Sequence, residues 1–217
     1  MKTRDRILDA ARQLFNTQGV AQISMRDIAG HLDMSVGNLW YHFKTKDLIV
    51  AELYQQLMGD MHTQVQQIPA ERDSIVSLLE SHRLMFSVQY RYKFFYLNLY
   101  DVLDQHPSVK DLYVQFSQQN REVAKGFLME YEQSGVFARP LTDRERNQLI
   151  TSGQMLNNTW AIDAELFYGG DAQGKLLHYM QICCQLFYPY LSTEAQQAYD
   201  SYFQALESQT GMSTVAS

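Results

Sequence analysis

Cysteine is scarce in this chain: Cys183 and Cys184 are the only two, and they are adjacent in the sequence. On a helix, neighbouring side chains point about 100° apart, so this pair is poorly placed to share a metal ion. The C-x-x-C spacing of zinc and redox motifs is absent as well. We therefore expect two buried, reduced thiols, with no disulfide framework and no metal site.

Long apolar runs are also missing. No stretch of about 18 apolar residues occurs, so we expect no membrane-spanning helix and no membrane partner. The first residues, MKTRDRILDAARQLF, mix charged and apolar positions at helical spacing and lack the continuous apolar centre of a signal peptide. With 46% hydrophobic and 19% charged residues, the composition is ordinary for a globular protein. Cytoplasmic localisation is the expectation.

Motifs that carry chemistry are absent. The sequence contains no G-x-S-x-G elbow, no G-x-x-x-x-G-K-[ST] phosphate loop, no G-x-G-x-x-G and no H-E-x-x-H. Its histidines are scattered along the chain, and each is better explained as surface or packing than as a ligand or a base. We therefore expect neither an enzyme nor a cofactor.

Strand signals are missing too, since neither a sustained alternation of apolar and polar residues nor an Asn-Gly hairpin occurs. The pattern predicts an all-α protein of about nine to ten helices. Besides two short helices within 24–42, we expect helices at 3–17, 46–67, 71–90, 92–105, 107–133, 142–167, 172–188 and 193–208. Residues 209–217 are small and polar, so we expect a flexible tail there.

The stretch from Ser24 to Leu48 is the most informative part of the chain. Ser24 with Asp27 is spaced as a capping box, and Ile23 with Ile28 as a hydrophobic staple. A turn at residues 33–35 leads into a second short helix that ends near residue 42. Two helices this short are not stable alone, but paired across a turn they are typical of a helix-turn-helix.

Charge is distributed unevenly along the chain. The formal net charge is −6, but residues 1–50 hold seven Lys/Arg against five Asp/Glu, and the remaining 167 residues hold 11 against 19. The balance is therefore +2 in the helix-turn-helix region and −8 elsewhere. This asymmetry favours a phosphate-binding surface in the first 50 residues.

The run GVAQISMRDIAGHLDMSVGNLWYHFKTKDL, residues 19–48, resembles the DNA-binding segment of the tetracycline-repressor (TetR) family of one-component bacterial regulators. The most specific part is GNLWYHFKTK, residues 37–46. Trp40 departs mildly from the family, which more often has tyrosine there. The resemblance covers about 50 of the 217 residues and implies a dimeric, ligand-responsive regulator of double-stranded DNA operators. The expected organisation is therefore a three-helix, helix-turn-helix DNA-binding domain (1–47) and a helical effector-binding and dimerisation domain (48–208).

Two groups of DNA-contacting residues are predicted. Asparagine can bond bidentately to adenine, valine methyls suit a thymine methyl, and glycine lets the backbone approach the groove. The candidates for base edges are Val36, Gly37, Asn38 and Tyr41. The resemblance further implies contacts to the phosphate backbone from Ser24, Met25, Arg26, Trp40, His42 and Lys46. For Trp40, packing in the core is the alternative.

Residues 85–104 are dense in aromatic side chains, several of them tyrosines with polar tips. Such a stripe is often ordinary core, but the resemblance implies an inducer cavity among the central helices. The hypothetical ligand-binding residues are Met85, Phe86, Gln89, Phe95, Leu99, Phe127, Met129, Tyr131, Met155 and Trp160.

The helices expected at 142–167 and 172–188 are candidates for the dimer interface, because both have broad apolar faces. The faces carry Asn147, Leu149, Ile150, Met155, Ala161 and Ile162 on one helix, and Leu176, Tyr179, Met180, Cys183, Leu186 and Phe187 on the other. The alternative is that these faces close the protomer's own core.

Together these observations predict a transcriptional repressor that is released from a pseudo-palindromic operator by a small, largely apolar effector. The alternative is a helical sensor or interaction protein that has the same fold but acts through a protein or a lipid-like partner.

Overall fold

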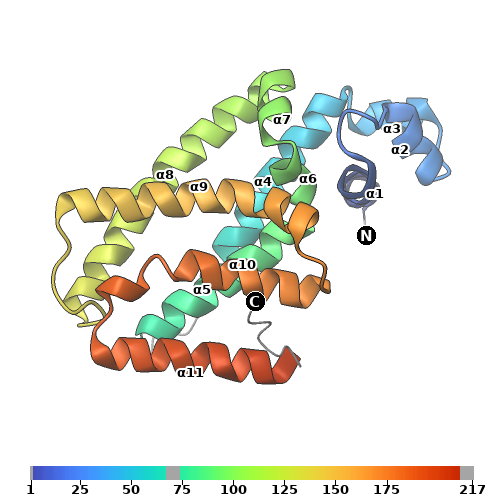
Figure 1. Ribbon diagram of the computed structural model, residues 1–217. Helices are drawn as coiled ribbons and strands as arrows, with labels where there is room; N and C mark the ends of the chain where they lie inside the picture. Colours follow the sequence, from blue (N-terminus) through green and yellow to red (C-terminus); the bar gives the residue numbers. More distant parts are fainter. Residues whose placement is uncertain (1, 67–73, 211–217) are drawn as a thin grey trace. The chain divides into compact units, whose positions relative to one another are not determined.

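The computed structural model describes residues 2–66 and 74–210. Within them the structure is helical and has no β-strand; one isolated antiparallel bridge joins Phe137 to Leu191 (Figure 1). This confirms the predicted all-α class. In the same residues, no helix is long and apolar enough to cross a membrane, and no cluster of His, Cys, Asp and Glu could hold a metal ion.

The chain divides into two compact units. Unit 1 comprises the described residues of Met1–Asp60 and Arg91–Ser117, and unit 2 those of Met61–Tyr90 and Gln118–Ser217. The predicted domain bounds at 47 and 208 stay a prediction, and most of the predicted tail, 211–217, lies outside the described residues.

Unit 1 contains α1 (Thr3–Gln18), α2 (Met25–His31), α3 (Val36–His42), most of α4 (Lys46–Gln66), α6 (Lys93–Leu97), α7 (Leu99–Gln105) and the start of α8 (Pro107–Gln133). Its core is built from the apolar stripe of α1 and the inward faces of α2, α3 and α4. Aromatic rings extend that core: Phe15 lies 5.4 Å from Phe94, and Tyr54 stacks on Phe95 at 4.8 Å between ring centroids.

Unit 2 contains α5 (Ser74–Arg91), the rest of α4 and α8, α9 (Asp143–Phe167), α10 (Ala172–Cys184), the 3-10 turn η1 (Tyr188–Tyr190) and α11 (Thr193–Thr210). Gly135, with φ of 76°, follows α8 and reverses the chain. The predicted capping box at Thr142 and Glu145 begins α9.

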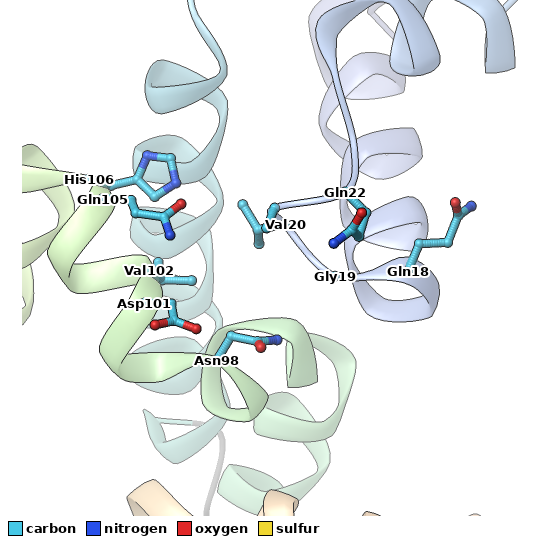
Figure 2. A pocket seen from close by; sticks show the side chains of 10 residues that line it. Gln18, Gly19, Val20, Gln22, Asn98, Asp101, Val102, Gln105 and His106 are labelled. Atoms are coloured by element: carbon cyan, nitrogen blue, oxygen red, sulfur yellow. The ribbon is translucent and has the colours of Figure 1, made fainter.

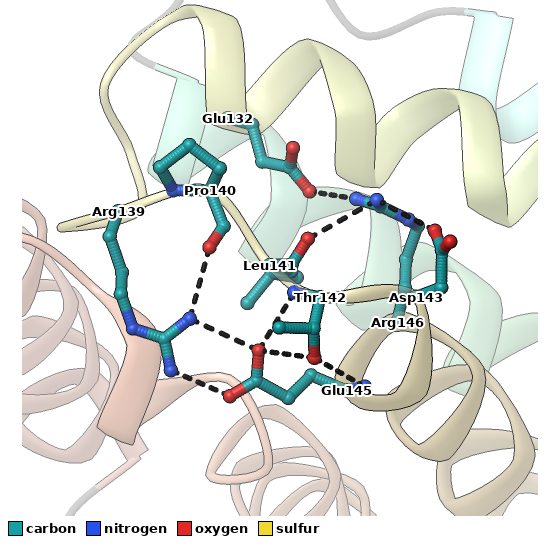
Figure 3. A network of polar contacts seen from close by, with 8 residues as sticks. All are labelled: Glu132, Arg139, Pro140, Leu141, Thr142, Asp143, Glu145 and Arg146. Atoms are coloured by element: carbon teal, nitrogen blue, oxygen red, sulfur yellow. Dashed lines mark hydrogen bonds and ion pairs between the residues drawn. The ribbon is translucent and has the colours of Figure 1, made fainter.

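A polar network secures this N-terminus of α9 (Figure 3). Glu145 accepts hydrogen bonds from the Thr142 backbone N–H (2.8 Å) and from the Arg139 guanidinium (2.6 Å). Arg146 contacts Glu132 at the end of α8 and donates to the Leu141 carbonyl at 3.2 Å. Bonding from Arg139 and Thr142 lowers the pKa of Glu145 to about 2.

Two predicted helices are wrong in extent. The helix expected at 92–105 is interrupted at Asn98 (φ −132°, ψ 35°), which separates α6 from α7. The helix expected at 172–188 ends at Cys184, and a turn then leads into η1.

Both cysteines are buried in α10, as predicted. Burial raises the pKa of the Cys183 thiol to about 12, so both groups are neutral packing side chains rather than reactive ones.

Candidate nucleic-acid interface

Local hydrogen bonds begin α2. The Asp27 backbone N–H donates to the Ser24 hydroxyl (3.3 Å), and the Asp27 carboxylate accepts from the Ser24 backbone N–H (2.7 Å). The Ser24 hydroxyl and backbone N–H together lower the pKa of Asp27. Ile23 and Ile28 are both buried, which confirms the predicted capping box and staple.

The turn between α2 and α3 is tight. Asp33 adopts a positive φ of 52°, a conformation that aspartate tolerates better than most side chains. The Met34 backbone N–H donates to the Ala29 carbonyl at 3.0 Å, which closes the turn. Ser35 then caps α3, because its hydroxyl accepts a hydrogen bond from the Asn38 backbone N–H at 3.1 Å.

Helix α3 has one buried face and one open face. Leu39 is fully buried and Phe43, just past the end of the helix, is 1% exposed, so these two side chains fix the helix to the unit 1 core. The opposite face carries Gly37 and Asn38, both exposed, and the 79% exposed Tyr41. A short, well-anchored helix thus presents its polar and aromatic side chains to solvent.

The remaining predicted DNA-contacting residues of α2 and α3 are exposed or half-buried. Trp40 is 52% exposed, so it is not packed in the core of unit 1. Arg26 is exposed on α2, Ser24 is exposed, and Val36 and His42 are half-buried. The His42 ring meets the Tyr41 ring edge-on at 5.3 Å.

Arg4 is a site residue that sequence reasoning missed. Its guanidinium donates to the carbonyl of His42 at 3.2 Å, lies 4.3 Å above the Phe43 ring and pairs with Glu52 on α4. It therefore satisfies a carbonyl at the C-terminus of α3 and ties α1 to α3 and α4. No local pattern could have revealed it, because its partners are 38 and 48 positions away.

Lys46 is oriented differently from the other predicted phosphate contacts. Its ammonium donates to the Val20 carbonyl at 2.9 Å and to the Ile23 carbonyl at 3.1 Å. Burial lowers the pKa of this lysine. In contrast, Arg6, Arg26 and Lys44 are exposed and have no ion pair within the described residues.

A small cavity of about 110 Å³ also lies in unit 1 (Figure 2). The end of α1 and the segment after it (residues 18–22) form one wall, and Asn98, α7 and His106 form the other. His106 is buried and contacts Asp47 at the start of α4. None of the residues predicted to bind ligand lines this cavity.

The predicted ligand-binding residues are brought together only in part. In unit 2, Trp160 donates from its indole Nε1 to the Gln89 side-chain oxygen at 2.5 Å, and its ring lies 4.8 Å from that of Phe86. Phe95 belongs to unit 1, where it stacks on Tyr54, and Leu99 also belongs to unit 1. Phe127, Met129 and Met155 are between 41% and 65% exposed, and Tyr131 stacks on Phe127. Met85 is half-buried.

The structure separates the two faces of α9. Leu149, Ile150 and Ala161 are buried within unit 2, whereas Met155, Ile162 and Leu166 are exposed. Beside the exposed stripe, a largely apolar groove of about 440 Å³ runs between α9 and α10 and includes Ile182 of α10. The predicted dimer residues are therefore of two kinds, some in the protomer's own core and some on an open apolar surface.

Two family models cover most of the chain. The model described as "Bacterial regulatory proteins, tetR family" matches residues 7–53, and "Bacterial transcriptional repressor" matches residues 53–199. A curated relative from Saccharopolyspora erythraea, an HTH-type transcriptional regulator, is 32% identical over 81 residues, which are 37% of this chain and 34% of that protein. The chain spans between 24% and 50% of the length of the first curated relatives that it matches.

Solved structures match over nearly the whole chain. A TetR-family regulator from Marinobacter aquaeolei superposes with a TM-score of 0.85 at 24% identity, over 95% of this chain and 99% of that one. A putative transcriptional regulator from Saccharomonospora viridis, solved in complex with choline, superposes with a TM-score of 0.70 at 21% identity, over 85% and 94%. At these identities the likeness shows the shared fold.

Proposed function

Because the chain belongs to the TetR family of bacterial transcriptional regulators, we propose that it is a ligand-responsive repressor acting in the cytoplasm. Two copies bind a pseudo-palindromic operator, and a small, largely apolar effector releases them. The family is one of transcriptional regulators rather than enzymes.

The observation that carries this proposal is the two-faced α3. Its buried Leu39 holds the helix rigidly, and its open face offers Asn38 and Tyr41 to a major groove. Val36 and Gly37, in the first turn, complete the base-reading group, since the N-terminal residues of a recognition helix meet base edges. Asparagine at such a position discriminates adenine through two hydrogen bonds.

Phosphate contacts flank this group. Arg26 supplies a guanidinium, while Ser24, Trp40 and His42 supply side-chain donors, and Met25 offers its backbone N–H at the start of α2. Lys46 completes the predicted phosphate-contacting group, and within the described residues its ammonium bonds to the carbonyls of residues 20 and 23.

Dimerisation provides the spacing. Two recognition helices must lie about 34 Å apart to meet successive major grooves on one side of the duplex. The open stripe of α9, with Met155, Ile162 and Leu166, and Ile182 of α10 supply an apolar surface for the second copy. A contiguous exposed apolar surface of this kind is typical of a protein interface.

Effector binding is assigned to unit 2, around the buried Gln89 and Trp160. An apolar environment with one fixed polar pair is typical of a small-molecule site. The choline complex of a structural neighbour supports a small organic effector but does not identify it for this chain. The effector lowers operator affinity only to the extent that it binds the released conformation more tightly.

Electrophoretic mobility shifts with genomic fragments from around the gene test this proposal. One fragment should be retarded at nanomolar protein, and an excess of random duplex should not compete. Wild-type protein should bind, while Asn38→Ala should bind the same fragment with reduced preference over its base-substituted versions. If no fragment is retarded, the repressor proposal fails and the sensor or interaction protein becomes the better account.

A further inference from the structure

Lys46 opens α4, yet its charged end is directed at the segment that connects α1 to α2. The ammonium lies 2.9 Å from the Val20 carbonyl and 3.1 Å from the Ile23 carbonyl. Within the described residues, no other side chain donates to either carbonyl. Ile23 immediately precedes the Ser24 cap, so the lysine holds the chain at the point where it enters α2.

The adjacent residue makes a contact to another element. Asp47 meets the buried His106, which follows α7. The first turn of α4 is therefore attached to residues 20–23 through Lys46 and to the end of α7 through Asp47. The 110 Å³ cavity lies between those same two elements, so direct packing of residues 18–22 on α7 is incomplete (Figure 2).

We propose that Lys46 is a positioning residue for DNA recognition, whose ammonium fixes the entry to α2 against the start of α4. Because α3 packs on α2, this contact also sets the place of the recognition helix. The proposal rests on the proposed DNA-binding function and assigns Lys46 a role other than the phosphate contact implied by family resemblance.

The two roles differ in their dependence on salt. A lysine that neutralises a phosphate displaces a counterion, so its removal makes the dependence of log K on log salt shallower by about 0.9 for each bound copy. A lysine that positions the recognition helix leaves that slope unchanged, and its removal weakens binding by the same factor at every salt concentration. Lys44 is the matched control, because it is exposed, two residues away and without an ion pair in the described part of unit 1.

The test compares full-length wild type with Lys46→Met, Lys46→Arg and Lys44→Met by thermal unfolding and by operator titration from 50 to 200 mM salt. Lys46→Met should lower Tm by about 4 to 10 °C, because two carbonyls lose a charged donor. It should weaken operator binding about tenfold with an unchanged salt slope. Lys46→Arg should recover more than half of both losses, since a guanidinium can also donate twice. Lys44→Met should leave Tm unchanged and make the slope shallower.

A shallower slope with an unchanged Tm for Lys46→Met would overturn the proposal, and so would wild-type affinity at all salt concentrations. If Lys46→Met does not fold, Lys46→Gln replaces it: its uncharged amide can still donate, so an unchanged salt slope supports the proposal and a shallower slope overturns it. A wild type that binds no duplex with sequence preference would overturn the proposed function, and this inference with it. That failure is visible in the wild type alone, before any variant is compared.

Discussion

Replacing Gln89 by leucine isolates the hydrogen bond at the centre of unit 2. The Gln89 side-chain oxygen accepts from the Trp160 indole N–H at 2.5 Å, and the two residues are 3% and 2% exposed. Leucine keeps a similar volume but removes the acceptor. The indole N–H then remains buried without a partner, which costs roughly 1–3 kcal/mol.

That penalty translates into a measurable change in Tm. For a chain of 150–250 residues, 1 kcal/mol shifts Tm by about 2–4 °C, so Gln89→Leu should lower Tm by roughly 2–12 °C. In a Trp160→Phe background there is no N–H to leave unpaired, and the same replacement should be nearly neutral. The difference between the two backgrounds measures the interaction between the two side chains directly.

Thermal unfolding monitored by circular dichroism provides the assay, and fluorescence adds a local readout. The chain has two tryptophans, so a Trp40→Phe background leaves Trp160 as the single emitter. Loss of the Gln89 acceptor should shift its emission before any unfolding occurs. An equal loss of Tm with and without the indole N–H would show that the cost comes from packing at Gln89 alone and not from the hydrogen bond.

Three further predictions concern other parts of the molecule. The pKa of Glu145 is lowered to about 2, so its stabilising contribution is complete above the ordinary carboxyl pKa and is lost as pH falls from about 5 to 2. Glu145→Gln should flatten this part of the pH dependence of Tm. An unchanged pH profile would show that the network around Glu145 does not stabilise the fold. Leu166 is 69% exposed on α9, so Leu166→Glu should leave helix content intact and give monomers in sedimentation equilibrium. A persistent dimer would show that the dimer interface does not include this part of α9. Leu39 is fully buried, so Leu39→Ala should cost about 2–5 kcal/mol in urea unfolding and weaken operator binding; a cost below about 1 kcal/mol would show that α3 is not anchored in the core.

The helix-turn-helix was predictable because its determinants are local. The contacts of Ser24 with Asp27, and of the Ser35 hydroxyl with the Asn38 backbone N–H, are capping contacts between residues three positions apart. Sequence spacing alone therefore reveals them. The all-α class follows for a similar reason, since helical periodicity is a local property of the chain.

The contacts that fix the recognition helix were not predictable. Arg4 reaches the carbonyl of His42, and Lys46 reaches those of residues 20 and 23, so both partners are backbone atoms with no sequence signature. The break at Asn98 was missed because the aromatic residues around it maintain a helical pattern. The apolar residues of α9 likewise recur at helical spacing on both faces, so only packing separates buried Leu149 from exposed Leu166.

Sequence-specific binding requires the open face of α3 to read bases, and selection of duplexes from a random library measures this. Wild-type protein should select a pseudo-palindrome with half-sites one helical turn, about 34 Å, or a multiple of it apart. Asn38→Ala should select the same spacing but lose preference at one base pair in each half-site, a loss of about 1–3 kcal/mol of discrimination. An identical consensus for both proteins, or selection of no consensus by the wild type, would contradict the claim.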